Sequence, residues 1–97
     1  MTIDTSKIGT TTTLSITGRL DTITSPDLES QIQKVTDAKA LVVDCSKLEY
    51  ISSAGLRVLL AAHKEFAKKD GLTVTNVSET VMDIFEVTGF DQILTIK

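Results

Sequence analysis

The chain contains no tryptophan, one proline and one cysteine among its 97 residues. The single cysteine, Cys45, excludes an internal disulfide and a metal site built only from thiolates of this chain. Cys45 ends an apolar run, which favours a small buried hydrophobic side chain, with a reactive thiol as the alternative.

Long apolar runs are also missing. No stretch approaches the roughly 20 apolar residues that cross a bilayer. The first residues, Met-Thr-Ile-Asp-Thr, lack the basic and apolar regions of a signal peptide. We therefore expect a cytoplasmic protein with no membrane partner.

Basic charge is sparse as well. The net charge is −3, and the densest basic spot, Lys68-Lys69, is followed at once by Asp70. A nucleic-acid groove needs a basic stripe, often with aromatic side chains on which bases stack, and the few aromatic residues here are expected in the core. We expect no nucleic-acid partner.

What is present suits one packed domain with a mixture of strands and helices. Hydrophobic residues make up 41% of the chain, which argues against disorder. Alternating or continuous apolar patterns predict strands, with Gly9 supplying a turn between the first two. The predicted strands are 2–7, 11–18, 40–43, 72–77 and 93–96.

Apolar residues at helical spacing predict three helices between these strands. The first begins at Ser25-Pro26-Asp27 and runs to about residue 37. The second begins near Ser53 and is stopped by Gly71. The third, in the segment 78–89, begins with a serine cap and ends at a glycine.

The order of these elements predicts the fold class. Strands separated by helices imply parallel pairs with right-handed crossovers, and the initial hairpin adds an antiparallel pair. We predict one α/β domain over residues 1–97. Its mixed, mostly parallel sheet has four to five strands and is accompanied by about three helices.

The segment 42–56 carries the strongest indication of a functional site. A buried strand ends at Asp44, a short loop follows, and a helix opens near Ser53. Ligands of open α/β sheets gather at the carboxyl ends of strands, and a helix beginning offers unpaired N–H groups. Ala54 and Gly55 leave Ser53 open to a kinase or a partner. Spacing alone allows a second interpretation, in which Ser53 is only the N-cap of the helix.

Three short motifs, each weak alone, form a specific pattern together. They are Gly18-Arg19-Leu20-Asp21, the apolar strand Leu41-Val42-Val43-Asp44, and the helix opening Ser52-Ser53-Ala54-Gly55-Leu56. The pattern resembles the anti-sigma factor antagonists of the STAS family over nearly the full length of the chain. The resemblance implies a single STAS domain.

The resemblance also implies a phosphorylation switch. In that family a partner serine kinase, which is also the anti-sigma factor, phosphorylates the serine that corresponds to Ser53. The unmodified antagonist binds this kinase and frees the sigma factor, the phosphorylated form releases it, and a PP2C-type phosphatase restores the first state. The implied partner-binding residues are Asp21, Ser52, Ala54, Gly55 and Leu56.

Two acidic positions and one serine have alternative roles. Family members commonly carry Asp where this chain has Ser52, so kinase specificity is in question and Ser52 becomes a rival acceptor to Ser53. Asp21 either contacts the partner or bonds its own turn. Asp44 is expected to cap the loop after its strand.

An enzyme is not expected. His63, the only histidine, lies on the apolar stripe of the second helix, roughly 15 Å along the axis from Ser53, so it cannot serve as a base for that serine. We expect a partly buried histidine with one hydrogen bond. A Gly-x-Ser-x-Gly elbow, a metal-ligand pair and a glycine-rich phosphate loop are all missing, so no cofactor is expected.

One alternative function remains open from the sequence. The chain could be a non-phosphorylated STAS module that acts as a ligand-binding or regulatory subunit of a transport or sensory assembly. Ser53 would then be only a helix cap.

Overall fold

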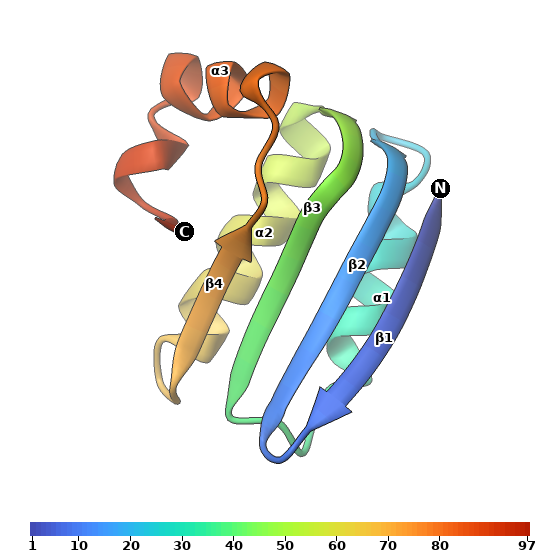
Figure 1. The fold of residues 1–97 in the computed structure, drawn as a ribbon, viewed down its shortest axis with the longest axis vertical. Coiled ribbons are helices and arrows are strands. Elements are labelled where there is room, and N and C mark those ends of the chain that lie inside the picture. The colour runs from blue at the N-terminus through green and yellow to red at the C-terminus, as the bar shows by residue number, and fades with distance from the viewer.

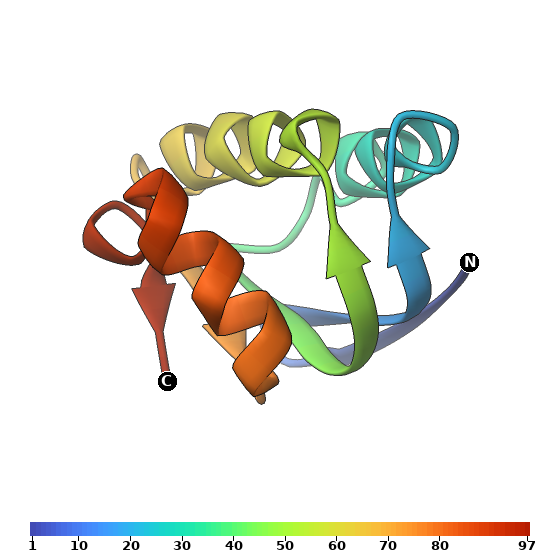
Figure 2. The same cartoon turned by 90° about the horizontal axis from the view of Figure 1, so that it is seen from above.

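A five-stranded sheet carries two helices side by side on one face in the computed structural model, which describes residues 1–97 (Figures 1 and 2). The strands lie in chain order, with β1 antiparallel to β2 and every later pair parallel. The strands are β1 (Thr2–Ile8), β2 (Thr11–Leu20), β3 (Ala40–Ile51), β4 (Gly71–Thr75) and β5 (Thr95–Ile96). The predicted mixed α/β fold is confirmed.

The helices follow the strands as predicted. They are α1 (Ser25–Gln33), α2 (Ser53–Phe66) and α3 (Glu79–Thr88), followed by the short 3₁₀ helix η1 (Phe90–Gln92). Helices α1 and α2 cover one face of the sheet, whereas α3 lies across the end where β3 and β4 finish (Figure 1). The Ser78 hydroxyl caps α3 by accepting from the Val81 N–H at 3.2 Å, and Gly89, at φ +79°, ends it.

The core lies between the sheet and the two helices. In β2, Leu14 and Ile16 are buried, while the alternating Thr13 and Ser15 face the other side. Each fully buried Leu, Ile, Val or Phe contributes about 1.5–3 kcal/mol relative to leaving it exposed. The largest fully buried side chains are Phe66, Phe85, Leu14, Ile16, Leu20, Leu28, Leu41, Ile51, Leu59, Val43, Val74 and Val81.

Strand β3 is longer than predicted. The prediction of a short loop after Asp44 is wrong, because the strand continues through this segment. The strand continues to Ile51 because it is irregular against β2, with register shifts after Ser15 and after Gly18 that each admit one extra residue. Its buried residues therefore recur every third position, at Cys45, Leu48 and Ile51, instead of alternating.

Several other boundaries differ from the predictions. Helix α1 ends at Gln33 instead of residue 37, because the chain turns back to begin β3. Val35 stays buried in that connection, which explains its helical spacing. Helix α2 ends at Phe66, and Gly71 begins β4 at φ +98° instead of stopping the helix. The last strand is limited to β5 because η1 precedes it.

Candidate functional site

The carboxyl ends of β2 and β3 bring the predicted motifs together. Ser52 is the only residue between β3 and α2. Its backbone N–H donates to the Leu20 carbonyl at 2.8 Å, and its own carbonyl accepts from the Leu56 N–H at 2.9 Å. This backbone link joins the beginning of α2 to the end of β2, and so joins the two motifs.

Ser52, and not Ser53, is the N-cap of α2. The Ser52 backbone is extended, and its hydroxyl accepts from the Gly55 N–H at 3.5 Å. Ser53 is the first helical residue and its side chain is exposed. The interpretation of Ser53 as the cap is therefore wrong, and its hydroxyl has no part in starting the helix.

Gly55 explains why the two motifs occur together. A Cβ atom at this position would lie 2.8 Å from Leu20 Cγ and 2.9 Å from Ile51 Cγ1, so only glycine lets the first turn of α2 approach β2 this closely. The adjacent Leu56 is also buried. These two predicted partner-binding residues hold the helix beginning in place, and the exposed or half-buried surface is formed by Ser52, Ser53 and Ala54.

Asp21 organises the turn between β2 and α1. Its Oδ1 accepts from the backbone N–H groups of Ile23 and Thr24, each at 3.0 Å, and from the Thr24 hydroxyl at 3.1 Å. The N–H of Thr24 is the main cause that lowers the pKa of the Asp21 carboxyl below 3.8. The arrangement matches the turn-forming interpretation of Asp21. The turn presents Ile23, whose side chain is 85% exposed.

A hollow of about 350 Å³ lies between the beginnings of α1 and α2. Both motif segments contribute to it, with Thr22 from the Asp21 turn and Ala54 from the helix opening. Its full lining is Thr22, Ser25, Pro26, Glu29, Ala54, Arg57 and Val58. The sequence analysis did not single out Arg57, although its spacing of four residues from Ser53 places both on one face of α2.

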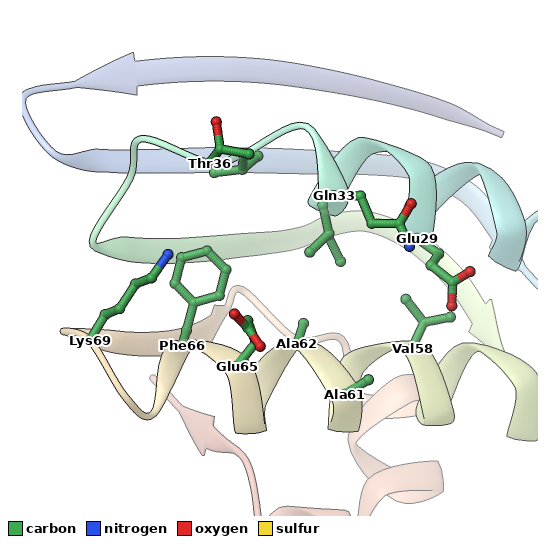
Figure 3. A pocket seen from close by; sticks show the side chains of 11 residues that line it. Glu29, Gln33, Thr36, Val58, Ala61, Ala62, Glu65, Phe66 and Lys69 are labelled. Carbon is green, nitrogen blue, oxygen red and sulfur yellow. The ribbon is translucent and has the colours of Figure 1, made fainter.

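A larger groove of about 470 Å³ runs between α1 and α2 (Figure 3). Ile32, Val58, Ala62 and Phe66 are among the apolar residues that line it. Figure 3 shows acidic side chains entering it from both helices, and Glu29 also lines the smaller hollow. The groove and the hollow therefore share Glu29 and Val58 in their linings.

Asp44 lies away from this site, inside β3. Its Oδ1 accepts from Asn76 Nδ2 and from the Ser46 N–H, both at 3.0 Å, and its Oδ2 accepts from the Ser15 hydroxyl at 3.4 Å. The bond from Asn76 is the main cause that lowers the pKa of the Asp44 carboxyl below 3.8. The predicted role as a loop cap is wrong because β3 continues beyond this residue. Asp44 instead links β2, β3 and the residue that follows β4.

Cys45 and His63 do not take part in the candidate site around Ser53. The Cys45 thiol is fully buried, and this burial raises its pKa to about 12, which fits the predicted structural role. His63 is half-buried on α2, as predicted. Its Nδ1 is buried without a hydrogen-bond partner, so the expected bond is not found at that atom.

The chain matches known proteins over almost its whole length. Residues 3–95 match the family model described as "Mlab, STAS domain". The putative anti-sigma factor antagonist BtrV of Bordetella bronchiseptica is 33% identical over 76 residues, which are 75% of this chain and 66% of that protein, just under two thirds of its length.

Solved structures show the same architecture. An anti-sigma factor antagonist from Mycobacterium paratuberculosis superposes with a TM-score of 0.88 at 28% identity, covering 98% of this chain and 83% of that one. The anti-sigma factor antagonist SpoIIAA in its unphosphorylated form superposes with a TM-score of 0.83 at 17% identity, covering 99% and 88%. None of the helices has the length and apolar character that a membrane span requires.

Proposed function

Because this chain belongs to the STAS domain family, we propose that it is an anti-sigma factor antagonist whose binding to an anti-sigma factor serine kinase is switched by phosphorylation of Ser53. The unmodified form sequesters the kinase. The phosphorylated form releases it, and a PP2C-type phosphatase removes the phosphate. The proposal places these events in the cytoplasm and gives the chain no catalytic activity of its own.

The observation that carries the proposal is the division of roles between two adjacent serines. Ser52 uses its hydroxyl to cap α2 and is half-buried, whereas Ser53 is exposed and free of that task. A kinase can reach the Ser53 oxygen without unfolding the helix beginning. Ser53 is therefore the preferred acceptor over Ser52.

The helix beginning tolerates the phosphate in the free protein. A phosphoserine adds about −1.5 to −2 charge and three acceptor oxygens. The first turn of α2 contains no acidic residue, and a negative charge near an exposed helix N-terminus gains about 0.3–1 kcal/mol. The fold need not change when the protein is modified.

A docked partner makes the same phosphate unfavourable. Inside an interface the charge must lose its water, and a penalty of about 2.8 kcal/mol reduces affinity a hundredfold. The surface that would meet the partner consists of the exposed Ser53, the half-buried Ser52 and Ala54, and the Asp21 turn. Gly55 and Leu56 support this surface from below, because both are buried. Support for a switch of this kind comes from SpoIIAA, which is known in an unphosphorylated and a phosphorylated form.

Intact-mass measurement tests the proposal. The native chain, Ser53→Ala and Ser52→Ala are each incubated with ATP and the anti-sigma-type serine kinase from the same genome. We expect a gain of about 80 Da in the native chain and in Ser52→Ala, and no gain in Ser53→Ala. A gain that persists in Ser53→Ala and disappears in Ser52→Ala would reverse the assignment.

The groove between α1 and α2 favours one alternative. An apolar groove with acidic rims could hold a ligand, as expected of a non-phosphorylated STAS module in a transport or sensory assembly. The same mass measurement separates the two functions. An unchanged mass under conditions that phosphorylate a control antagonist would favour the ligand-binding module.

A further inference from the structure

Arg57 follows Ser53 by four residues on α2, and it has no acidic partner. The protein's only salt bridge joins Lys7 to Asp37 at 3.1 Å. The other arginine, Arg19, is stacked over the Tyr50 ring, with its Cζ 4.4 Å from the ring centroid. The guanidinium of Arg57 is therefore uncommitted, although the side chain lines the hollow beside the helix opening.

The position of Arg57 relative to Ser53 is favourable for a direct contact. Both residues are exposed and lie four positions apart on α2, which places them on the same helix face, one turn from each other. A guanidinium binds a phosphate through two parallel N–H···O bonds, a geometry that a lysine cannot reproduce. Glu29 lines the same hollow but makes no ion pair with Arg57.

We propose that Arg57 is the intramolecular counter-ion of phosphorylated Ser53. The inference rests on the proposed function only in that Ser53 is taken as the modified residue. In the unmodified protein the guanidinium is free and exposed at the edge of the hollow. In the phosphorylated protein the Arg57 guanidinium extends back by one helical turn, toward the N-terminus of α2, and binds the phosphate oxygens.

The ion pair changes what the modification does to the surface. Phosphorylation adds an anion at Ser53 and at the same time withdraws a cation from the hollow between α1 and α2. A partner that uses an acidic group to contact Arg57 therefore loses that contact when Ser53 is modified. The release signal consists of two charge changes at one place, with no movement of the backbone.

A ³¹P NMR titration tests the ion pair on the protein alone. Phosphoserine is incorporated directly at position 53 during synthesis, so no kinase or partner is needed. The parent phosphoprotein is compared with Arg57→Gln, Arg57→Lys and Lys64→Gln. The last variant removes the same charge from an exposed position of α2, two turns further from the phosphate.

The expected result follows from the charge of the pair. A nearby cation favours the doubly charged phosphate and lowers its second pKa, which is about 6 in the absence of a partner. Removing the cation should raise the titration midpoint by about 0.15–0.4 pH unit in Arg57→Gln. Arg57→Lys should recover part of this difference, and Lys64→Gln should titrate like the parent.

Two outcomes would overturn the proposal. One is an identical midpoint in the parent and Arg57→Gln, and the other is an equal rise in Arg57→Gln and Lys64→Gln. The Arg57 side-chain N–H signal gives a second measurement in the unsubstituted chain, where it should shift and exchange more slowly with water after modification. Because the phosphate is installed directly, a failure here is distinct from a failure of the kinase to modify Ser53.

Discussion

At the scale of single residues, the site depends on two serines that are chemically identical and differ only in position. Ser52 lies before the first helical turn and caps it, while Ser53 lies in that turn with its side chain exposed. The sequence predicted that α2 begins near Ser53, as found, but the possible cap was assigned to Ser53 instead of Ser52. Which serine caps the helix depends on where β3 ends. The extra residues of β3 interrupt its alternating pattern, so the end of the strand could not be predicted from the sequence.

The two serines should therefore differ in their effect on stability. Ser52→Ala removes the cap and should lower the free energy of unfolding by about 0.5–1 kcal/mol, at the lower end of the usual range because the bond is long. Ser53→Ala should change it by less than about 0.5 kcal/mol. Urea unfolding followed by circular dichroism measures both, and equal losses in the two variants would contradict the assignment of the cap.

Gly55 gives a second prediction at this scale. Gly55→Ala gains up to about 1 kcal/mol of helix propensity, but its Cβ overlaps Leu20 and Ile51, and overpacking of this kind costs about 1–3 kcal/mol. We expect a net loss of roughly 1 kcal/mol in thermal or urea unfolding.

A double-mutant cycle identifies the cause of that loss. In a Leu20→Ala background the contacts with Leu20 are removed while the one with Ile51 Cγ1 at 2.9 Å stays, so the loss caused by Gly55→Ala should become smaller. If Gly55→Ala lowered the free energy of unfolding as much in that background as in the parent, contact with Leu20 would not be the reason that position 55 requires glycine.

At the scale of elements, the helices and the alternating strands were predictable from the sequence, and the irregular strand was not. In β2 a buried residue alternates with a half-buried one as far as Ile16, and the pattern with period two reveals the strand. In β3 the extra residues break this period after Asp44. Local sequence contains no information on which partner residues β3 pairs with, so its second half looked like a loop.

The polar link formed by Asp44 predicts an acid dependence of stability. Hydrogen bonds lower the folded-state pKa of Asp44 below 3.8, so its contribution is complete above that value and is lost as the pH falls through the folded pKa. Unfolding midpoints in urea between pH 7 and pH 3 should fall toward the acid end. Asp44→Asn should be less stable than the parent at pH 7, with a flatter curve below about pH 4.

The control for this prediction is Asp83→Asn, which removes an exposed carboxylate of α3. It should follow the pH curve of the parent. A parent-like slope in Asp44→Asn would show that the link between β2, β3 and Asn76 does not contribute to acid sensitivity.

At the scale of the whole molecule, the order of elements determined the fold class, and family resemblance pointed to the site. Neither source could show that Gly55 and Leu56 are buried beneath the surface they were expected to form. That result depends on the close approach of α2 to Leu20, which involves segments more than thirty residues apart. The placement of Arg57 at the hollow between α1 and α2 required the assembled fold for the same reason.

The closed core predicts the reactivity of Cys45. Its thiol is fully buried and its pKa is raised to about 12, so at pH 8 almost none of it is an accessible thiolate. A thiol-specific reagent should modify the native protein only at the rate at which the molecule unfolds, and within seconds in urea. Rapid labelling of the native protein would contradict the described packing around β3.

The central claim is that a phosphate on Ser53 separates the protein from its kinase partner. The direct measurement is a calorimetric titration of the anti-sigma-type serine kinase from the same genome into the unmodified chain, Ser53→Ala, Ser53→Asp and the chain carrying phosphoserine at position 53. The account predicts equal affinity for the first two, weaker binding by Ser53→Asp, and a loss of about a hundredfold or more for the phosphorylated chain. Equal affinity of the kinase for the unmodified and phosphorylated chains would contradict it.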